Sequence, residues 1–180
     1  MSIFKTFKTI FARSGDPLVE EALDAPNKIA DRRNHERRDA REGTRALIID
    51  DSPTIVMALK RFLRSAGYVT LEAGDAEKGI EIARTERPEL IFLDIVLPGM
   101  NGFAALRLLR RDPVTRDVPI IMISGNEQAT EQFFGTRIGA DDFMKKPFSR
   151  FEVFARIERL LDADLVPRRT TSTVPQSRPV

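Results

Sequence analysis

One stretch decides the fold of this chain: Ala-Leu-Ile-Ile-Asp-Asp over residues 46–51, four apolar residues followed by an acidic pair. A short apolar run that ends in turn-forming residues is typical of a buried strand in a parallel sheet. Three later apolar runs end in a similar way, each with a polar residue behind it: Asp94 after 90–93, Ser124 after 119–123, and Lys146 just beyond Phe143-Met144.

The carboxyl ends of parallel strands lie at one edge of an open α/β sheet, where ligands and chemistry gather. We therefore expect Asp50, Asp51, Asp94, Ser124 and Lys146 to meet at that edge. Three carboxylates, one hydroxyl and one ammonium suit a divalent cation and a phosphoryl group.

Apolar runs alternate with amphipathic stretches five times between residues 44 and 162. Strands are expected near 45–50, 68–72, 89–94, 118–123 and 141–145. Helices are expected from Pro53 until Gly67, and then over 75–86, 102–111, 127–138 and 149–161. Such alternation predicts an α/β fold: a five-stranded, doubly wound parallel sheet in the flavodoxin-like order 2-1-3-4-5, with helices on both faces.

The composition is that of a globular protein, with 42% hydrophobic and 31% charged residues. The chain has no cysteine, which excludes disulfides, cysteine-bound zinc and thiol catalysis. Its single histidine, His35, lies among arginines and aspartates and cannot build a histidine metal site alone. No apolar stretch reaches the length of a membrane span and no secretory signal is present, so we predict a cytoplasmic protein.

The formal net charge is only +2, although the sequence pI is about 9.1. Residues 44–161 hold 17 basic and 17 acidic side chains, so the basic surplus lies in the flanks. This balance predicts no nucleic-acid groove in the folded part. Three zones follow: an N-terminal extension over 1–43, a folded domain over 44–162, and a C-terminal tail over 163–180 that we expect to be disordered.

An aspartate can attack phosphorus and form an acyl phosphate. Neighbouring carboxylates and an incoming phosphoryl group repel one another, and Mg²⁺, which prefers oxygen ligands, relieves that repulsion. Phosphoryl transfer then needs a cation and a hydroxyl donor, which Lys146 and Ser124 supply. Taken singly, each residue has a structural alternative as a helix cap or turn residue. Their coincidence at the ends of four strands favours the functional interpretation.

Four segments resemble the receiver (CheY-like) domain of response regulators in two-component signalling, and the resemblance covers residues 44–162. They are Leu-Ile-Ile-Asp-Asp-Ser-Pro-Thr at 47–54, Leu-Asp-Ile-Val-Leu-Pro-Gly-Met-Asn-Gly at 93–102, Ile-Met-Ile-Ser-Gly at 121–125, and Gly-Ala-Asp-Asp-Phe-Met-Lys-Lys-Pro-Phe at 139–148. Within the family, the sequence is most similar to stand-alone regulators of chemotaxis-like and twitching-motility pathways.

The resemblance implies a role for each residue of the acidic site. Asp94 is expected to be the phospho-acceptor, in a reaction that the domain itself catalyses without being a turnover enzyme. Asp51 is expected to be the main Mg²⁺ carboxylate, with Asp50 acting directly or through water. Asp94 and the backbone carbonyl of Val96 complete the implied ligand set.

The resemblance also implies a switch. Lys146 is expected to pair with the phosphoryl group, next to a Lys146-Pro147 bond that family members usually hold cis. Ser124 is expected to move toward the phosphoryl oxygen and let Phe143 turn inward. Two departures matter: Phe143 replaces a frequent tyrosine, and the apolar Val96 is expected to slow hydrolysis of the acyl phosphate.

The implied phosphoryl donor is a histidine kinase or phosphotransfer protein. No further domain is predicted after residue 162, so output is expected through an unidentified protein that binds the face formed by 127–138, 141–145 and 149–161. The alternative is a phosphate sink that drains a kinase without binding a target.

Two features of residues 1–43 leave other functions open. Residues 1–11 place Ile3, Phe4, Phe7, Ile10 and Phe11 on one helical stripe, which could bind a membrane, dock on a partner or pack on the chain's own domain. Arg37 and Arg41 have a spacing that resembles the arginine motif of cyclic-di-GMP-binding PilZ domains, which allows a cyclic-di-GMP-responsive adaptor. The interleaved acidic residues favour a solvated, self-paired linker instead.

Overall fold

The computed structural model describes residues 38–136 and 139–169. The chain divides into two units, residues 1–36 and 37–180, and all described residues belong to the second. The predicted stripe over 1–11, and Arg37 of the arginine motif, lie outside the described residues. Within the described ranges, no helix is both long enough and apolar enough to cross a membrane.

The centre of the described unit is one sheet of five parallel strands in the order β2-β1-β3-β4-β5, as the sequence predicts. The strands are β1 (Arg45–Ile49), β2 (Val69–Ala73), β3 (Leu90–Asp94), β4 (Ile120–Ser124) and β5 (Asp142–Lys145). β1, β3 and β4 are almost entirely buried, because helices cover both faces of the sheet.

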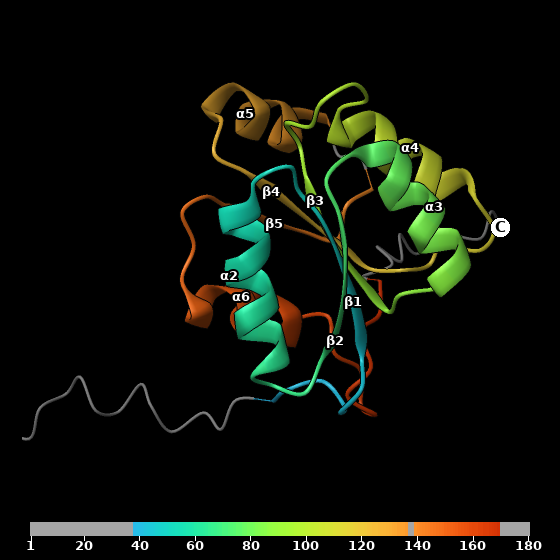
Figure 1. Ribbon diagram of the computed structural model, residues 1–180, viewed down its shortest axis with the longest axis vertical. Helices are drawn as coiled ribbons and strands as arrows, with labels where there is room; N and C mark the ends of the chain where they lie inside the picture. Colours follow the sequence, from blue (N-terminus) through green and yellow to red (C-terminus); the bar gives the residue numbers. More distant parts are fainter. Residues whose placement is uncertain (1–37, 137–138, 170–180) are drawn as a thin grey trace, which may run out of the picture. The chain divides into compact units, whose positions relative to one another are not determined.

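Five helices connect or follow the strands: α2 (Pro53–Arg64), α3 (Ala76–Glu86), α4 (Gly102–Arg111), α5 (Glu127–Thr136) and α6 (Arg150–Glu158). Figure 1 shows α2 and α6 on one side of the sheet and α3 and α4 on the other. Each layer has its own core, one built around Leu59, Leu63 and Phe154 and the other around Ile80 and Leu106. Full burial of one such side chain stabilises the fold by about 1.5–3 kcal/mol.

Local signals set where the helices begin. Asp75, Asn101 and Ser149 are N-caps whose side chains accept a hydrogen bond from a backbone N–H of the first turn. At α2, Ser52 is the N-cap without such a side-chain bond, and Pro53 is the first helical residue. These residues set the starts of α2, α3, α4 and α6, each of which follows the loop at the carboxyl end of a strand.

The last helix differs from its prediction. α6 ends at Glu158, and residues 159–169 turn back through an antiparallel bridge between Leu161 and Pro167. Residues 163–169 therefore belong to the described structure, whereas 170–180 lie outside it. The domain boundaries at 43/44 and 162/163 stay predictions.

Candidate functional site

The carboxyl edge of the sheet carries the acidic pair that follows β1. Asp50 is 2% exposed, and its Oδ1 accepts the Ser52 N–H at 3.0 Å, which fixes the side chain at the turn into α2. Asp51 is exposed at the same turn. Asp94, the last residue of β3, is 3% exposed and accepts the Val96 N–H through Oδ1 at 3.3 Å.

Lys146 joins the two buried carboxylates. Its Nζ lies 2.7 Å from Asp50 Oδ2 and 2.8 Å from Asp94 Oδ2. Lys146 directly follows β5, and its backbone N–H donates to the carbonyl of Ser124, the last residue of the neighbouring β4, at 2.8 Å. The Lys146-Pro147 peptide bond is cis. Of the residues that the sequence predicts at this edge, Asp50 and Asp94 are thus brought together around one ammonium group.

Burial and the charges of the site shift the pKa values of Asp94 and Lys146. Burial raises the pKa of Asp94 above its ordinary value, and the hydrogen bond from Lys146 only partly offsets this. Burial alone would lower the pKa of Lys146, but the hydrogen bonds and charges of Asp50 and Asp94 raise it. The lysine is therefore held as a cation, and the acidic group as a whole remains short of positive charge.

The three aspartates could hold a cation. Ligand oxygens of Asp50, Asp51 and Asp94 lie within 4.8 Å of one another. Asp50 Oδ2 is buried and lies 2.7 Å from the Lys146 ammonium, and because a carboxylate oxygen has more than one lone pair it can also bind a cation. An all-oxygen set of carboxylates suits a hard cation such as Mg²⁺. The residues present fit the predicted metal.

Glycine and asparagine position the loop that follows Asp94. A Cβ on Gly102 would lie 2.0 Å from the Asp94 carbonyl oxygen, so only glycine permits this approach of α4 to β3. The Gly102 N–H donates to the Ile95 carbonyl at 2.9 Å, and Asn101 caps α4 through the Ala104 N–H at 2.9 Å. The Asn-Gly pair thus closes the loop behind the phospho-acceptor predicted from the sequence.

The predicted switch residues lie on β4 and β5. Ser124 is fully buried, and its Oγ accepts the Asn126 N–H at 3.1 Å. Phe143 is 7% exposed and stacks on Phe133 of α5, with ring centroids 4.9 Å apart. Phe143 already points inward here, against an aromatic partner that sequence reasoning did not single out.

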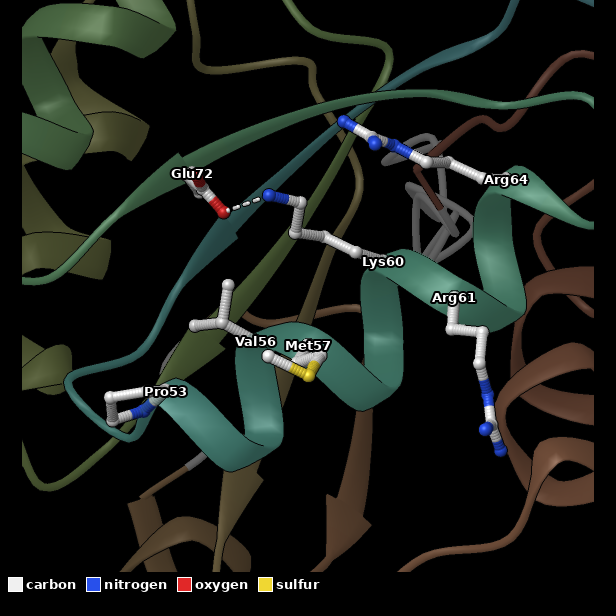
Figure 2. Close-up of a pocket in the computed structure, with 7 residues that line it drawn as sticks. All are labelled: Pro53, Val56, Met57, Lys60, Arg61, Arg64 and Glu72. Carbon is white, nitrogen blue, oxygen red and sulfur yellow. Dashed lines mark ion pairs between the residues drawn. The ribbon is translucent and has the colours of Figure 1, made fainter.

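A groove runs along α2 from the acidic edge. It has a volume of about 500 Å³ and lies between α2 and β2 (Figure 2). Lys60 crosses it to Glu72, with 2.7 Å between Nζ and Oε2, while Arg61 points away from that pair. Met57 is 70% exposed although it is apolar. Because Pro53 begins both the helix and the groove, this apolar and basic surface lies next to Asp51.

Sequence reasoning missed an ionic network at the opposite edge of the sheet. Asp141, with a side chain 1% exposed, pairs with Arg110 at 2.7 Å and with Arg169 at 3.2 Å. Arg41, half of the proposed arginine motif, pairs with Glu89 and so takes part in the fold. Asp141 is visible in the sequence as an acidic residue before a strand, but its partners Arg110 and Arg169 lie about 30 residues away on either side, so no local pattern indicates the network.

This fold, with its acidic cluster at the carboxyl edge of the sheet, is that of a signalling receiver domain. The family model described as the response regulator receiver domain matches residues 46–158. The chain belongs to this family.

Two curated relatives show how far the similarity extends. Protein PilH of Pseudomonas aeruginosa is 38% identical over 117 residues, which cover 65% of this chain and 97% of PilH. The DNA-binding dual master transcriptional regulator RpaA of Synechocystis is 39% identical over 133 residues, 74% of this chain but 52% of RpaA. Apart from PilH, the chain spans about half the length of the curated relatives described here and of regulators such as PhoP of Bacillus subtilis.

Solved structures give the same result. The chemotaxis protein CheY4 of Vibrio cholerae aligns with a TM-score of 0.61 at 26% identity, covering 66% of this chain and 99% of CheY4. The receiver domain of the P. aeruginosa sensor histidine kinase PA1611 aligns with a TM-score of 0.59 at 30% identity, over 65% and 95% of the two chains. That structure holds a magnesium ion in its active site cleft.

Proposed function

We propose that this chain is a stand-alone response regulator whose Asp94 accepts a phosphoryl group from a histidine kinase or phosphotransfer protein. The observation that carries the proposal is the position of Asp94. Its side chain is buried, has a carboxylate oxygen within 4.8 Å of those of Asp50 and Asp51, and contacts the Lys146 ammonium. The domain supplies the catalysis of its own phosphorylation, and it does not act as a turnover enzyme.

The proposed transfer is a substitution at phosphorus. A carboxylate oxygen of Asp94 forms the new P–O bond and the P–N bond of the phosphohistidine breaks. The imidazole takes up a proton from water and leaves as the neutral ring. Lys146 already lies 2.8 Å from the Asp94 carboxylate, so its ammonium can pair with the phosphoryl oxygens once it leaves its bridge between Asp50 and Asp94. Asp50 and Asp51 would hold Mg²⁺, with Asp94 and the Val96 carbonyl. That ion supplies charge neutralisation and alignment of the phosphoryl oxygens.

Ser124 and Phe143 are the proposed relay to a partner. Ser124 is the last residue of β4 and lies in register with Lys145 of β5. A phosphoryl oxygen that accepts the Ser124 O–H would draw the hydroxyl toward Asp94 and change the geometry of the hydrogen bond that Oγ accepts from the Asn126 N–H. The stack of Phe143 on Phe133 would transmit the change to α5, and the partner would bind the α5-β5-α6 face. Chemotaxis-like motility signalling is the proposed pathway class, and the similar CheY4 of Vibrio cholerae is a chemotaxis protein.

The groove beside α2 is the proposed contact for the protein donor of the phosphoryl group. It adjoins Asp51, and its exposed Met57 and Arg61 offer an apolar contact next to a positive charge. A donor surface with apolar and acidic side chains complements it. Arg61→Glu is expected to slow transfer from the cognate donor about tenfold. It should leave phosphorylation by acetyl phosphate unchanged, because that small donor needs no protein contact.

The chemical test of the site is reductive trapping. Borohydride reduces an aspartyl phosphate to homoserine, which marks the modified position in a peptide map. The account predicts homoserine at residue 94 after treatment with acetyl phosphate and Mg²⁺. Homoserine at another aspartate, or none, would overturn the assignment. A normally phosphorylated chain whose affinity for every candidate target is unchanged would point to the phosphate-sink function.

A further inference from the structure

Residues 159–169 form a strap that lies beyond residues 46–158, the part that matches the receiver family. The strap is internally ordered: the Arg168 N–H donates to the Leu160 carbonyl at 2.7 Å, and the Asp162 N–H donates to the Val166 carbonyl at 3.0 Å. Val166 is 9% exposed. This segment is therefore built into the domain surface, outside the part of the chain that matches the family model.

One side of the strap holds the N-terminal flank, residues 38–43. The Arg41 N–H donates to the Leu165 carbonyl at 3.1 Å, and the Arg38 guanidinium donates to the Asp162 carbonyl at 3.0 Å. Ala40 of the same flank is 7% exposed. The chain that precedes the receiver is thus fastened to the strap at its point of entry.

The other side of the strap is fastened to the residues that open β5. Arg169 contacts Asp141 at 3.2 Å and the carbonyls of Arg116 at 3.3 Å and Gly139 at 3.5 Å. Asp141 accepts from Arg110 at 2.7 Å and from the Ile120 N–H at 2.8 Å through its other oxygen. Asp141 therefore joins the strap to β4 and α4 through a single buried carboxylate.

β5 carries the connection to the phosphorylation edge. It spans only Asp142–Lys145, so about 16 Å of extended chain separates Asp141 from Lys146. Lys146 now bridges Asp50 and Asp94. A phosphoryl group on Asp94 would place its oxygens beyond the carboxylate, and Lys146 must leave this bridge to reach them. A short strand bonded at both ends has little freedom to absorb such a shift.

We propose that the strap is a regulatory element, seated while Lys146 bridges Asp50 and Asp94 and loosened when a phosphoryl group at Asp94 displaces that lysine. Arg169 is the positioning residue that ties the strap to β5, and the N-terminal flank is the segment released with it. The inference rests on the proposed phosphorylation of Asp94. Linkage makes the effect reciprocal: weakening the attachment of the strap to Asp141 must favour the phosphorylated arrangement by the same factor.

The test uses the full chain, with beryllofluoride and Mg²⁺ as the phosphoryl mimic. Amide hydrogen exchange of residues 159–169 and 38–43 is expected to quicken severalfold when the mimic binds. Arg169→Ala should bind the mimic about three- to tenfold more tightly and show fast strap exchange with or without it. Arg169→Lys, which keeps the charge, should restore part of the response.

Arg168→Ala is the matched control, because Arg168 pairs with Asp162 inside the strap at 3.0 Å and does not contact Asp141 in the described structure. It should keep the wild-type affinity for the mimic. If the mimic shifts the Ser124 and Phe143 amide resonances but leaves strap exchange unchanged, the inference is wrong while the proposed function stands. The same holds if Arg169→Ala and Arg168→Ala bind the mimic with equal affinity. If the mimic does not bind, or binds Asp94→Asn as well, the proposed function fails and the inference falls with it.

Discussion

The two edges of the sheet each bury an aspartate, but they balance its charge differently. At the carboxyl edge, Asp94 and Asp50 share the single ammonium of Lys146, and Asp51 lies beside them. At the opposite edge, Asp141 alone receives Arg110, Arg169 and a backbone N–H. The first edge has more carboxylates than cations, and the second has more cations than carboxylates.

This difference separates a reactive site from a structural one. Burial raises the pKa of both Asp94 and Asp141, so desolvation alone does not distinguish them. A carboxylate whose lone pairs are saturated by hydrogen bonds has little capacity for another ligand. A group of carboxylates short of positive charge attracts a cation and leaves a nucleophilic oxygen accessible.

The largest expected effect comes from breaking the saturated edge at Arg110. Its guanidinium donates to the carbonyls of Gly139, Arg116 and Val118 as well as to Asp141, and burial lowers its pKa to about 10. Arg110→Met would leave a buried carboxylate and three carbonyls short of donors, so we expect a loss of about 3–5 kcal/mol in the free energy of unfolding. Denaturant titration measures this.

Arg107→Met is the matched control on the exposed side of the same helix and should change the free energy of unfolding by less than about 0.5 kcal/mol. A loss of under about 1 kcal/mol for Arg110→Met would show that the network is not the structural anchor described above.

A smaller effect is expected when the unsaturated edge loses its cation. Lys146→Ala removes the only ammonium within ion-pair distance of Asp50 and Asp94 among the described residues. Without metal, we expect it to lower the free energy of unfolding by about 1–3 kcal/mol. Mg²⁺ should still bind and restore part of this stability. Phosphorylation of the variant should no longer shift the resonances of β4 and α5, because the contact that distinguishes the two states is lost.

Lys145→Ala provides the comparison, since Lys145 is exposed and lies 3.5 Å from Glu127 on the surface. It should leave stability and the spectral response intact. Resonances of β4 and α5 that move normally in phosphorylated Lys146→Ala would contradict the assigned role of the lysine.

The smallest effect is a gain in stability. Because the folded-state pKa of Asp94 is raised, the folded chain binds this proton more tightly than the unfolded chain does. The ionised group therefore opposes folding at neutral pH, and this penalty fades as pH falls through the folded pKa toward the ordinary value of 3.8. Asp94→Asn should raise the Tm near neutral pH by about 3 °C.

The Tm advantage of Asp94→Asn should disappear in acid, and Mg²⁺ should stabilise the wild type more than the variant. Thermal unfolding across pH 4–8 measures both effects. If Asp94→Asn were less stable than the wild type at neutral pH without metal, the ionised Asp94 carboxylate would not destabilise the fold.

Much of the fold and the acidic edge could be predicted from sequence because both depend on local patterns. The apolar run at 46–49 indicates a strand from its local pattern alone, and the parallel pairing of β1 with β3 then places Asp50 and Asp94 at one edge of the sheet. The other edge depends on distant pairings. Arg110 lies in the helical stretch Arg-Leu-Leu-Arg-Arg at 107–111, where only tertiary contacts reveal that it points to Asp141.

The same limit explains two further differences. The helix expected to reach residue 161 ends at Glu158, because the chain turns to pair Leu161 with Pro167, a contact that no local pattern indicates. The stack of Phe133 on Phe143 joins residues from a helix and a strand, so the inward position of Phe143 could not be inferred from the phenylalanine alone.

The most direct test of the contrast between the edges compares one buried acid from each edge, Asp94 and Asp141. Intact-mass spectrometry of the chain with acetyl phosphate and Mg²⁺ should detect one phosphoryl group on the wild type. The same single adduct should form on Asp141→Asn, disappear in Asp94→Asn, and disappear from the wild type when a chelator removes the metal. An adduct of similar yield on Asp94→Asn, or one indifferent to the chelator, would contradict the account.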